Sequence, residues 1–176
     1  MRYVCLLRGI NVGGNNTVSM KVLKELLLKA GFLNVVTYIN SGNIIFDCNK
    51  DNQDLSAQIE KIILDGFGVS SRVLLIDKET YISIINRIPD HFVNDDHFKA
   101  DVIFYLDGVT EEMLTTLKFR SEIEEVIHLN QALIYGIKRE NQTKSALIKM
   151  VGTKLYYNVT IRNVNTSRKL VELLNQ

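Results

Sequence analysis

The stretch Tyr3-Val-Cys-Leu-Leu-Arg8-Gly9-Ile-Asn11-Val-Gly13-Gly14-Asn15-Asn16 decides how the first half of the chain folds. An apolar run ends at an arginine, a loop with three glycines follows, and Ser19 then precedes residues with helical periodicity. This pattern predicts a strand over residues 2–8 and a helix over residues 19–30. Ser19 can cap this helix and Gly31 can end it. Its inner face is expected to hold Met20, Leu23, Leu26 and Leu27.

The next elements complete the first half of the fold. Strands are expected over 35–39 and 44–46, joined by Asn40-Ser41-Gly42-Asn43, whose residue types tolerate positive φ. A helix over 54–67 and a strand over 71–76 follow. The order β-α-β-β-α-β is the split β-α-β of ferredoxin-like folds.

The second half repeats this order. A helix over 78–87 stops before Pro89, and the polar, acidic segment 89–99 connects it to a strand over 101–106. A helix over 111–118, strands over 126–129 and 133–137, a helix over 143–151, an extended segment over 158–162 and a terminal helix over 166–175 are then predicted. The predicted class is α+β, with two ferredoxin-like-type α/β subdomains (βαββαβ, then βαββα) packed together and a C-terminal helix. The predicted boundaries are 1–78, a linker helix and acidic loop over 79–99, and 100–176.

Two of the predicted strands are apolar on both of their alternating faces, namely Val4–Leu7 and Val73–Ile76. An antiparallel sheet that left one face in water would alternate apolar and polar residues. We therefore expect the second face of the first sheet to be buried, by the second half of the chain or by the terminal helix.

Composition is that of an ordinary globular protein, with 46% hydrophobic and 23% charged residues in a chain of 176. The sequence contains neither an apolar run long enough to span a membrane nor a signal peptide. Cys5 and Cys48 are then expected to be free thiols of a cytoplasmic protein. The sequence does not indicate an oligomeric state.

The opening loop is the first candidate site. Gly9 and Gly14 have the spacing of a phosphate-binding loop, but Asn15-Asn16 stand where Lys-Ser/Thr is required, which excludes a Walker-type NTPase. The loop still offers the backbone amides of Gly13 and Gly14, the side-chain amides of Asn11 and Asn16, and the cation Arg8 to an anion. The alternative is that the glycines only permit a tight connection and that Arg8 pairs with a carboxylate.

The segment Thr160-Ile-Arg162-Asn163-Val-Asn165-Thr166-Ser-Arg168-Lys169 is the second candidate. If Asn165 or Thr166 caps the last helix, Arg162 and Asn163 stand beside its free amides, and the cations Arg168 and Lys169 oppose its dipole. The alternative is a capped surface helix with solvated basic residues.

The two candidate segments are expected to meet. No nearby carboxylate in either local sequence can neutralise Arg8 or Arg162. We therefore expect the two arginines to converge on one cleft, together with Gly13, Gly14, Asn16 and Thr166. This cleft is expected to bind an anionic small molecule, and a phosphorylated compound is one candidate. No catalytic residues and no cofactor are indicated, and whether a reaction follows binding stays open.

The histidines indicate no metal site. His91 and His97 lie in Pro89-Asp-His-Phe-Val-Asn-Asp-Asp-His97, whose spacing matches no established metal-ligand set, so no metal is predicted. His128 falls on an apolar strand and is expected to be a core histidine.

A binding module for nucleic acid or protein is the alternative function. Residues 129–176 contain eight Lys/Arg and two Asp/Glu, whereas the chain as a whole has a net charge of +1. The third strand lacks the paired aromatic residues that stack RNA bases, which argues against nucleic acid. Binding to a phosphate backbone would weaken steeply with salt, whereas a buried anion pocket would be screened only weakly.

Two segments carry a family resemblance. Leu6-Leu-Arg8-Gly-Ile-Asn11-Val-Gly-Gly14 and Thr160-x-Arg162-Asn163-x-Asn165-Thr166 are similar to the bacterial domain-of-unknown-function 1697 family, whose members commonly carry Trp where Val164 stands. The resemblance implies two α/β subdomains in a compact cytosolic protein. It implies no activity, because none is established for the family.

Overall fold

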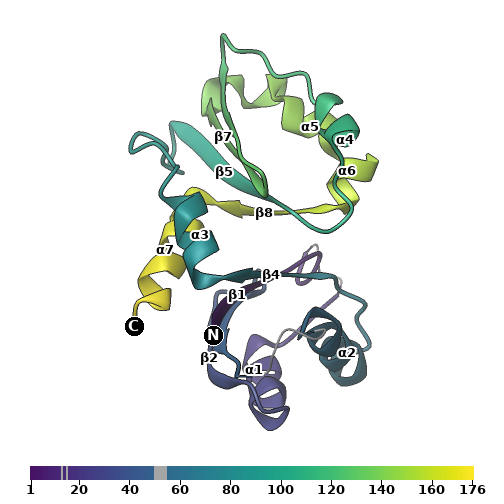
Figure 1. Ribbon diagram of the computed structural model, residues 1–176. Helices are drawn as coiled ribbons and strands as arrows, with labels where there is room; N and C mark the ends of the chain where they lie inside the picture. The colour runs from purple at the N-terminus through teal and green to yellow at the C-terminus, as the bar shows by residue number, and fades with distance from the viewer. Residues whose placement is uncertain (13, 15, 50–54) are drawn as a thin grey trace. The chain divides into compact units, whose positions relative to one another are not determined.

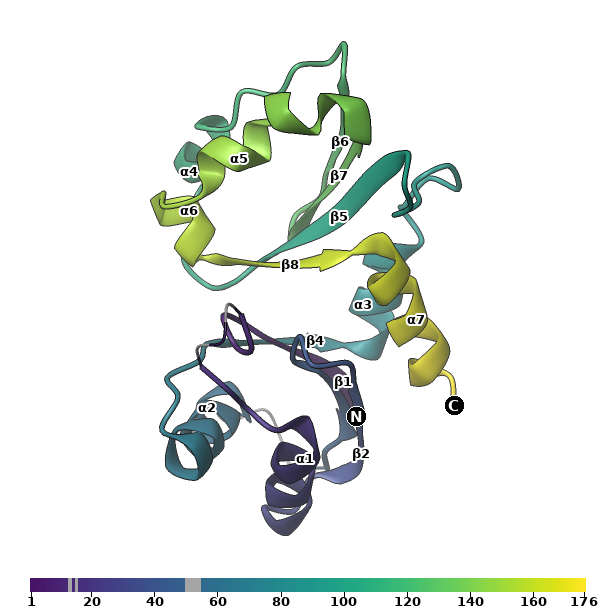
Figure 2. The ribbon, with the colours of Figure 1, turned by 180° about the vertical axis from the view of Figure 1, so that it is seen from behind.

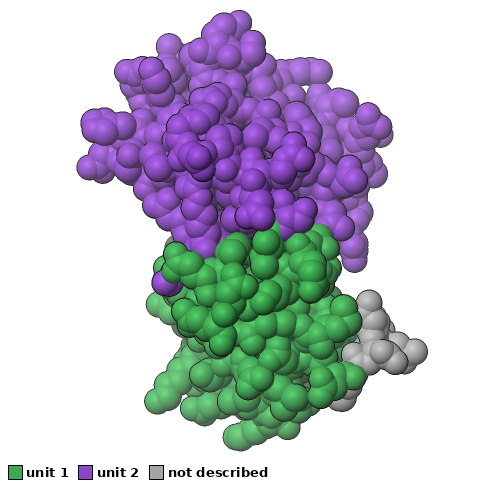
Figure 3. Space-filling model, turned by 60° about the vertical axis from the view of Figure 1, so that its left-hand side comes forward, with its two compact units in different colours: residues 1–82, 170–176 green, residues 83–169 purple. Residues whose placement is uncertain are grey.

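The chain folds into two compact units, which the computed structural model describes for residues 1–12, 14, 16–49 and 55–176 (Figures 1 and 3). Unit 1 comprises Met1–Ile82 and Leu170–Gln176, and unit 2 comprises Ser83–Lys169. Each unit has one four-stranded sheet in which all neighbouring strands are antiparallel. The predicted α+β class is therefore confirmed.

Unit 1 has the strand order β2-β3-β1-β4, which is the connectivity of a split β-α-β unit. Its elements are β1 (Arg2–Leu7), α1 (Met20–Lys29), β2 (Leu33–Tyr38), β3 (Asn43–Asp47), α2 (Leu55–Phe67), β4 (Val73–Asp77) and the start of α3 (Lys78–Ile85). Both α1 and α2 lie on the same face of this sheet (Figures 1 and 2).

Local sequence explains the ends of α1. The Ser19 hydroxyl accepts a hydrogen bond from the Val22 amide at 3.4 Å, so Ser19 is the N-cap that its position predicts. Gly31 has φ +92°, a conformation that glycine adopts without the steric cost of a side chain, and it follows the last turn. The helix buries Met20, Leu23 and Leu27 against the sheet.

Both faces of β1 are buried, as its apolar composition predicts. Val4 and Leu6 on one face and Cys5 and Leu7 on the other are at most 1% exposed. The C-terminal end of α7 (Val164–Leu174) lies beside the sheet of unit 1. There the Leu173 carbonyl accepts from Arg2 at 3.3 Å, and the Leu174 carbonyl accepts from Lys78 at 3.1 Å.

Unit 2 has the strand order β6-β7-β5-β8, so it repeats the connectivity of unit 1. Its elements are β5 (Phe98–Tyr105), α4 (Glu111–Thr115), β6 (Glu124–His128), β7 (Ala132–Lys138), the 3₁₀ helix η1 (Arg139–Lys144), α5 (Ala146–Met150), α6 (Lys154–Tyr157), β8 (Val159–Asn163) and the start of α7. The short helices α4, α5 and α6 lie over one face of the sheet (Figures 1 and 2). Buried apolar side chains of β5, β7 and β8 form the core beneath them.

The segment after β7 differs from its prediction. A single helix over 143–151 is wrong, because Ser145 is extended (φ −60°, ψ 136°) and separates η1 from α5. Its hydroxyl accepts from the Leu147 amide at 3.1 Å and so caps α5. The helix α6 was not predicted, and α4 ends at Thr115 rather than at residue 118.

Two further expectations are corrected. Asn163, not Asn165 or Thr166, caps α7, since its side-chain oxygen accepts from the Thr166 amide at 2.8 Å and the helix begins at Val164. His128 is exposed rather than part of the core, and its ring lies against Phe119 with centroids 6.1 Å apart. None of the helices in the described part of the chain has the length and apolarity that crossing a membrane requires.

Candidate functional site

The loop after β1 is held by its own polar groups. The Arg8 amide donates to the Arg72 carbonyl at 2.9 Å, and the Arg8 carbonyl accepts from the Ser71 hydroxyl at 2.9 Å, which fixes this end of the loop to the residues just before β4. Gly9 and Gly14 both have positive φ, as their predicted role in a tight connection requires. Gly13 lies outside the described residues.

The two asparagines of this loop bond to its backbone. Asn11 has φ +53°; its side-chain amide donates to the Val18 and Asn40 carbonyls at 2.9 and 2.8 Å, and its oxygen accepts from the Val18 amide at 2.8 Å. The Asn16 side chain donates to the Gly9 carbonyl at 2.9 Å. These bonds hold the side chains of Asn11 and Asn16 to the backbone, and a direct role for the asparagines in ligand binding stays a prediction.

The predicted residues of the second segment are also bonded within the fold. Arg162 is buried, and its guanidinium donates to the Thr160 hydroxyl and the Ile161 carbonyl, both at 2.9 Å. Asn163 caps α7, and Thr166 supplies the amide that it caps. Arg8 belongs to unit 1 and Arg162 to unit 2, so that their convergence on one cleft stays a prediction.

Arg168, in the first part of α7, bonds to backbone carbonyls of the protein. Arg168 donates to the Phe92 carbonyl at 2.6 Å and to the Pro89 carbonyl at 3.0 Å. It therefore fastens the turn around Pro89 to α7 within unit 2.

Unit 2 contains a buried carboxylate, Glu124, that the sequence analysis did not single out. The residue is 4% exposed, and its carboxylate accepts three hydrogen bonds of 2.7 Å, from the Tyr135 hydroxyl and from the amides of Arg120 and Ala146. Charge-assisted bonds of this kind are among the strongest in proteins. Glu124 thereby ties the start of α5 to β6 and β7.

Ser145 extends this hydrogen-bond chain to a cavity. The oxygens of Tyr135 and Ser145 are 2.6 Å apart, and because the single Tyr135 proton bonds to Glu124, the Ser145 hydroxyl donates to Tyr135. Burial raises the pKa of Tyr135, with the neighbouring Glu124 and Asp101 adding to the shift. Both Glu124 oxygens already accept bonds, so that the chain fixes Ser145 in place rather than providing it with a free base.

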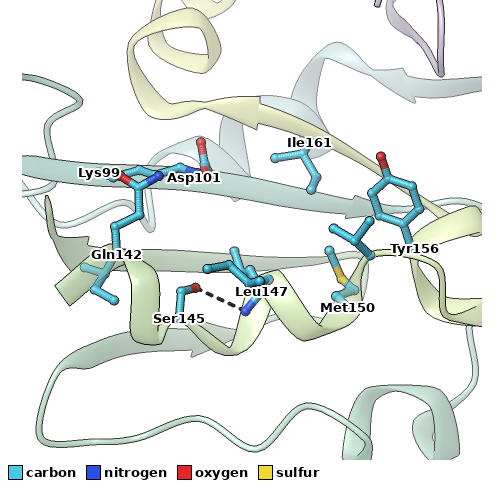
Figure 4. A pocket seen from close by; sticks show the side chains of 11 residues that line it. Lys99, Asp101, Gln142, Ser145, Leu147, Met150, Tyr156 and Ile161 are labelled. Atoms are coloured by element: carbon cyan, nitrogen blue, oxygen red, sulfur yellow. Dashed lines mark hydrogen bonds and ion pairs between the residues drawn. The ribbon is translucent and has the colours of Figure 1, made fainter. Parts of the chain in front are cut away.

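The cavity lies between the sheet of unit 2 and the segment η1–α5–α6, and its volume is about 300 Å³. Figure 4 shows Lys99 and Asp101 of β5 on one side, and Ser145 and Leu147 at the start of α5 on the other. Most of the remaining wall is apolar. The lining residues not yet named are Ile137, Gln142, Ile148, Met150, Val151, Tyr156 and Ile161.

Asp101 and Lys99 are the charged groups of the described wall. Asp101 is 6% exposed, and its Oδ2 lies 3.4 Å from the Lys99 ammonium. Burial raises the pKa of Asp101, and the opposing attraction of Lys99 and Arg139 does not cancel this effect. A carboxylate and an ammonium thus lie side by side at the edge of an apolar cavity.

His91 and His97, in the segment 89–97, each lie beside a carboxylate. His91 lies 2.9 Å from the Glu125 carboxylate, and its ring contacts Phe92 at a centroid distance of 5.0 Å. The His97 amide donates to the Asp95 carboxylate at 2.8 Å. Within the described ranges, no three His, Cys, Asp or Glu side chains are grouped so that they could hold a metal ion.

Only a weak signal in the sequence marks the residues of the cavity wall. Lys99 and Asp101 alternate with apolar residues at the start of β5, where charged side chains are unusual on a face that helices cover. Ser145 followed by Ala-Leu is an N-cap pattern. Their proximity depends on the pairing of β5 with β7 and on the fold of the segment 139–157.

Comparison with known proteins identifies relatives but no activity. The family model described as "Protein of unknown function (DUF1697)" matches residues 1–135, a range that includes Arg8, Lys99, Asp101 and Glu124. Among solved structures, the conserved bacterial protein SP0830 from Streptococcus pneumoniae is similar, with 28% sequence identity, a TM-score of 0.83 and 98% of each chain covered. No curated protein matches the chain.

Proposed function

The chain belongs to the DUF1697 family, and because the description of that family states no activity, we propose a function from the geometry of unit 2: the protein binds a small molecule with an anionic group in the cavity beside Lys99. The carrying observation is the charged pair Lys99–Asp101 at the edge of an otherwise largely apolar cavity of about 300 Å³. Small-molecule sites characteristically combine apolar walls with a few polar groups that orient the ligand.

Lys99 is the group that would hold the anion. Of the described residues lining the cavity, it alone carries a positive charge, and its side chain is 33% exposed. Arg139 lies close enough to influence the Asp101 carboxyl and adds to the positive potential. An ion pair between Lys99 and a ligand would be strengthened by the surrounding low dielectric.

The site supports binding more directly than catalysis. Ser145 is the candidate nucleophile in the wall, but it donates its proton to Tyr135, whose own proton bonds to a Glu124 carboxylate that accepts two further hydrogen bonds. An activated serine requires an adjacent base that is able to take up the proton. Binding in a cytoplasmic bacterial setting, as Cys5 and Cys48 and the family resemblance indicate, is the proposal.

The cleft expected between the Arg8–Gly14 loop and the Arg162–Thr166 segment remains part of the proposal as a second anion site. Its test is Arg8→Ala, which should abolish stabilisation by inorganic phosphate while the protein without ligand stays folded. Stabilisation that survives this substitution would remove the Arg8 loop from the proposal.

A nucleic-acid or protein surface in residues 129–176 has less support. All three arginines in this range donate to protein acceptors: Arg139 to Asn94 at 2.9 Å, Arg162 to Thr160 and Arg168 to Phe92. The basic residues of this third are therefore partly committed to the fold.

Thermal unfolding of the full chain in the presence of simple anions tests the proposal. We expect 4-methylpentanoate, an aliphatic carboxylate of suitable size, to raise the midpoint, and Lys99→Met to remove the effect. Lys149→Met, at an exposed position of α5 outside the cavity wall, is the matched control and should keep it. The shift should depend only weakly on salt. Equal shifts in wild type and Lys99→Met would contradict the proposal.

A further inference from the structure

Unit 2 buries two carboxylates on the helix-covered face of its sheet, and they differ in hydrogen bonding. Glu124 accepts three bonds of 2.7 Å. Asp101, which is almost equally buried, has a single partner in the described part of the chain, the Lys99 ammonium at 3.4 Å, and that contact uses Oδ2. Oδ1 of Asp101 therefore retains its capacity to accept hydrogen bonds at the wall of the cavity.

Oδ1 of Asp101 is not fully enclosed, so water or a ligand in the cavity can reach it and satisfy it. Its position in the cavity wall means that a ligand can supply the missing donors. An ammonium group meets this requirement best, since it brings several N–H donors together with a positive charge.

An anionic group alone would be a poor match for this wall. A negative charge held by Lys99 would also lie near Asp101, whose carboxylate is only 3.4 Å from the Lys99 nitrogen. At such separations, repulsion between like charges in a poorly solvated site offsets much of the attraction. A ligand that carries both charges on neighbouring atoms avoids this conflict.

We infer that the ligand is a small zwitterion, a free α-amino acid with an aliphatic side chain, whose ammonium group binds Asp101 and whose carboxylate binds Lys99. This inference rests on the proposed function and narrows its ligand class. Ile137, Leu147, Met150 and Ile161 line the rest of the cavity and match an aliphatic side chain. A volume of about 300 Å³ is at the small end of ligand sites, which suits an amino acid better than a nucleotide.

Three ligands with the same aliphatic group distinguish the contribution of the ammonium group from that of the carboxylate. L-Leucine carries both, 4-methylpentanoate lacks the ammonium group, and 3-methylbutylamine lacks the carboxylate. Calorimetric titration of the full chain should give an affinity for leucine at least tenfold higher than for either analogue, because removing one member of a buried charge pair leaves the other charge without its partner.

Substitutions assign each charge to its residue. Asp101→Asn should weaken leucine at least tenfold but leave 4-methylpentanoate bound as tightly as before or more tightly, since a repulsive charge is gone. Lys99→Met should weaken leucine and 4-methylpentanoate together. Asp96→Asn, the same exchange at an exposed position that contributes nothing to the cavity wall, should change neither affinity.

The outcomes separate this inference from the proposed function. If 4-methylpentanoate binds wild type as tightly as leucine does, the zwitterion is wrong while an anion site remains. If 3-methylbutylamine alone matches leucine, or if none of the three ligands binds, the zwitterion and the anion site are both wrong. Unchanged leucine affinity in Asp101→Asn would remove Asp101 from the site.

Discussion

Replacing Glu124 by Gln tests whether one buried carboxylate holds the wall of the cavity together. The Glu124 oxygens accept three bonds of 2.7 Å from groups on three different segments. In Gln, a carbonyl oxygen can still serve Tyr135 and Ala146, but the amide nitrogen then faces the Arg120 N–H, and two donors meet. A buried donor without an acceptor costs about 1–3 kcal/mol, and the remaining bonds lose their charge assistance.

We therefore expect Glu124→Gln to lower the free energy of unfolding by about 3 kcal/mol. For a chain of this length, that corresponds to a fall in the midpoint temperature of roughly 6–12 °C. Tyr135→Phe should cost about 1–3 kcal/mol, because Glu124 keeps both backbone donors but the Ser145 hydroxyl loses the phenol oxygen to which it donates. Urea unfolding followed by circular dichroism gives both values.

The neighbouring residue provides the control. Glu125 is exposed and faces His91 rather than the core, so Glu125→Gln should change stability by less than about 0.5 kcal/mol. If Glu124→Gln and Glu125→Gln are equally stable, the three short bonds contribute nothing that water does not replace, and the role assigned to Glu124 is refuted.

Three further predictions follow from single contacts. Asp101→Asn should raise the stability of the ligand-free protein by on the order of 1 kcal/mol near neutral pH. Folding raises the pKa of Asp101 above its ordinary 3.8, so the ionised carboxylate destabilises the wild-type protein fully only above the folded pKa. The stability gained by Asp101→Asn should therefore shrink as the pH falls toward 3.8 and vanish below it. Urea titrations in which this gain does not change with pH would contradict the prediction. Gly136→Ala should lower the free energy of unfolding by about 1–3 kcal/mol, because the new Cβ would lie 2.6 Å from Cζ of Phe92. If thermal unfolding shows this variant to be as stable as the wild type, the Phe92 ring can move aside. Asn11→Ala should lower the free energy of unfolding in urea by about 2 kcal/mol, because three hydrogen bonds are lost and alanine is disfavoured at a φ of +53°. A loss below about 0.5 kcal/mol would mean that the loop does not depend on these three bonds.

Much of the fold could be predicted because short-range signals decide it. Ser19 and Gly31 delimit α1 as their residue types indicate. The continuous apolar run of β1 correctly predicts a strand that is buried on both faces. Such signals act within a few residues, where the sequence states all the relevant chemistry.

The errors fall where distant residues decide the local backbone. Periodicity alone favours one helix over 143–151, but Tyr135 bonds the Ser145 hydroxyl and Glu124 bonds the Ala146 amide, and these partners hold Ser145 in an extended conformation. His128 lies on a strand with an apolar pattern, yet its position at the edge of the sheet, on β6, leaves it exposed. No local pattern contains this information.

The candidate sites divide in the same way. The glycine loop was conspicuous because its residue types lie next to one another, but the side chains of Asn11 and Asn16 prove to bond to backbone groups of the protein. Lys99, Asp101 and Ser145 are inconspicuous in sequence, and their proximity arises only when β5 and the segment before α5 come together. When a site is assembled from distant segments, each segment alone carries only a weak sequence signal.

The contrast between Glu124 and Asp101 gives the strongest reason to look for a ligand in unit 2. If both carboxylates served stability alone, both would be expected to accept several hydrogen bonds from the protein, since such bonds offset the free energy that burying a charge costs. Glu124 meets this expectation with three bonds, and Asp101 does not. A residue that weakens the ligand-free protein but faces a cavity fits a site where stability has been exchanged for function. The same variant tests both sides of this argument, because Asp101→Asn should gain stability without ligand and lose stabilisation by leucine.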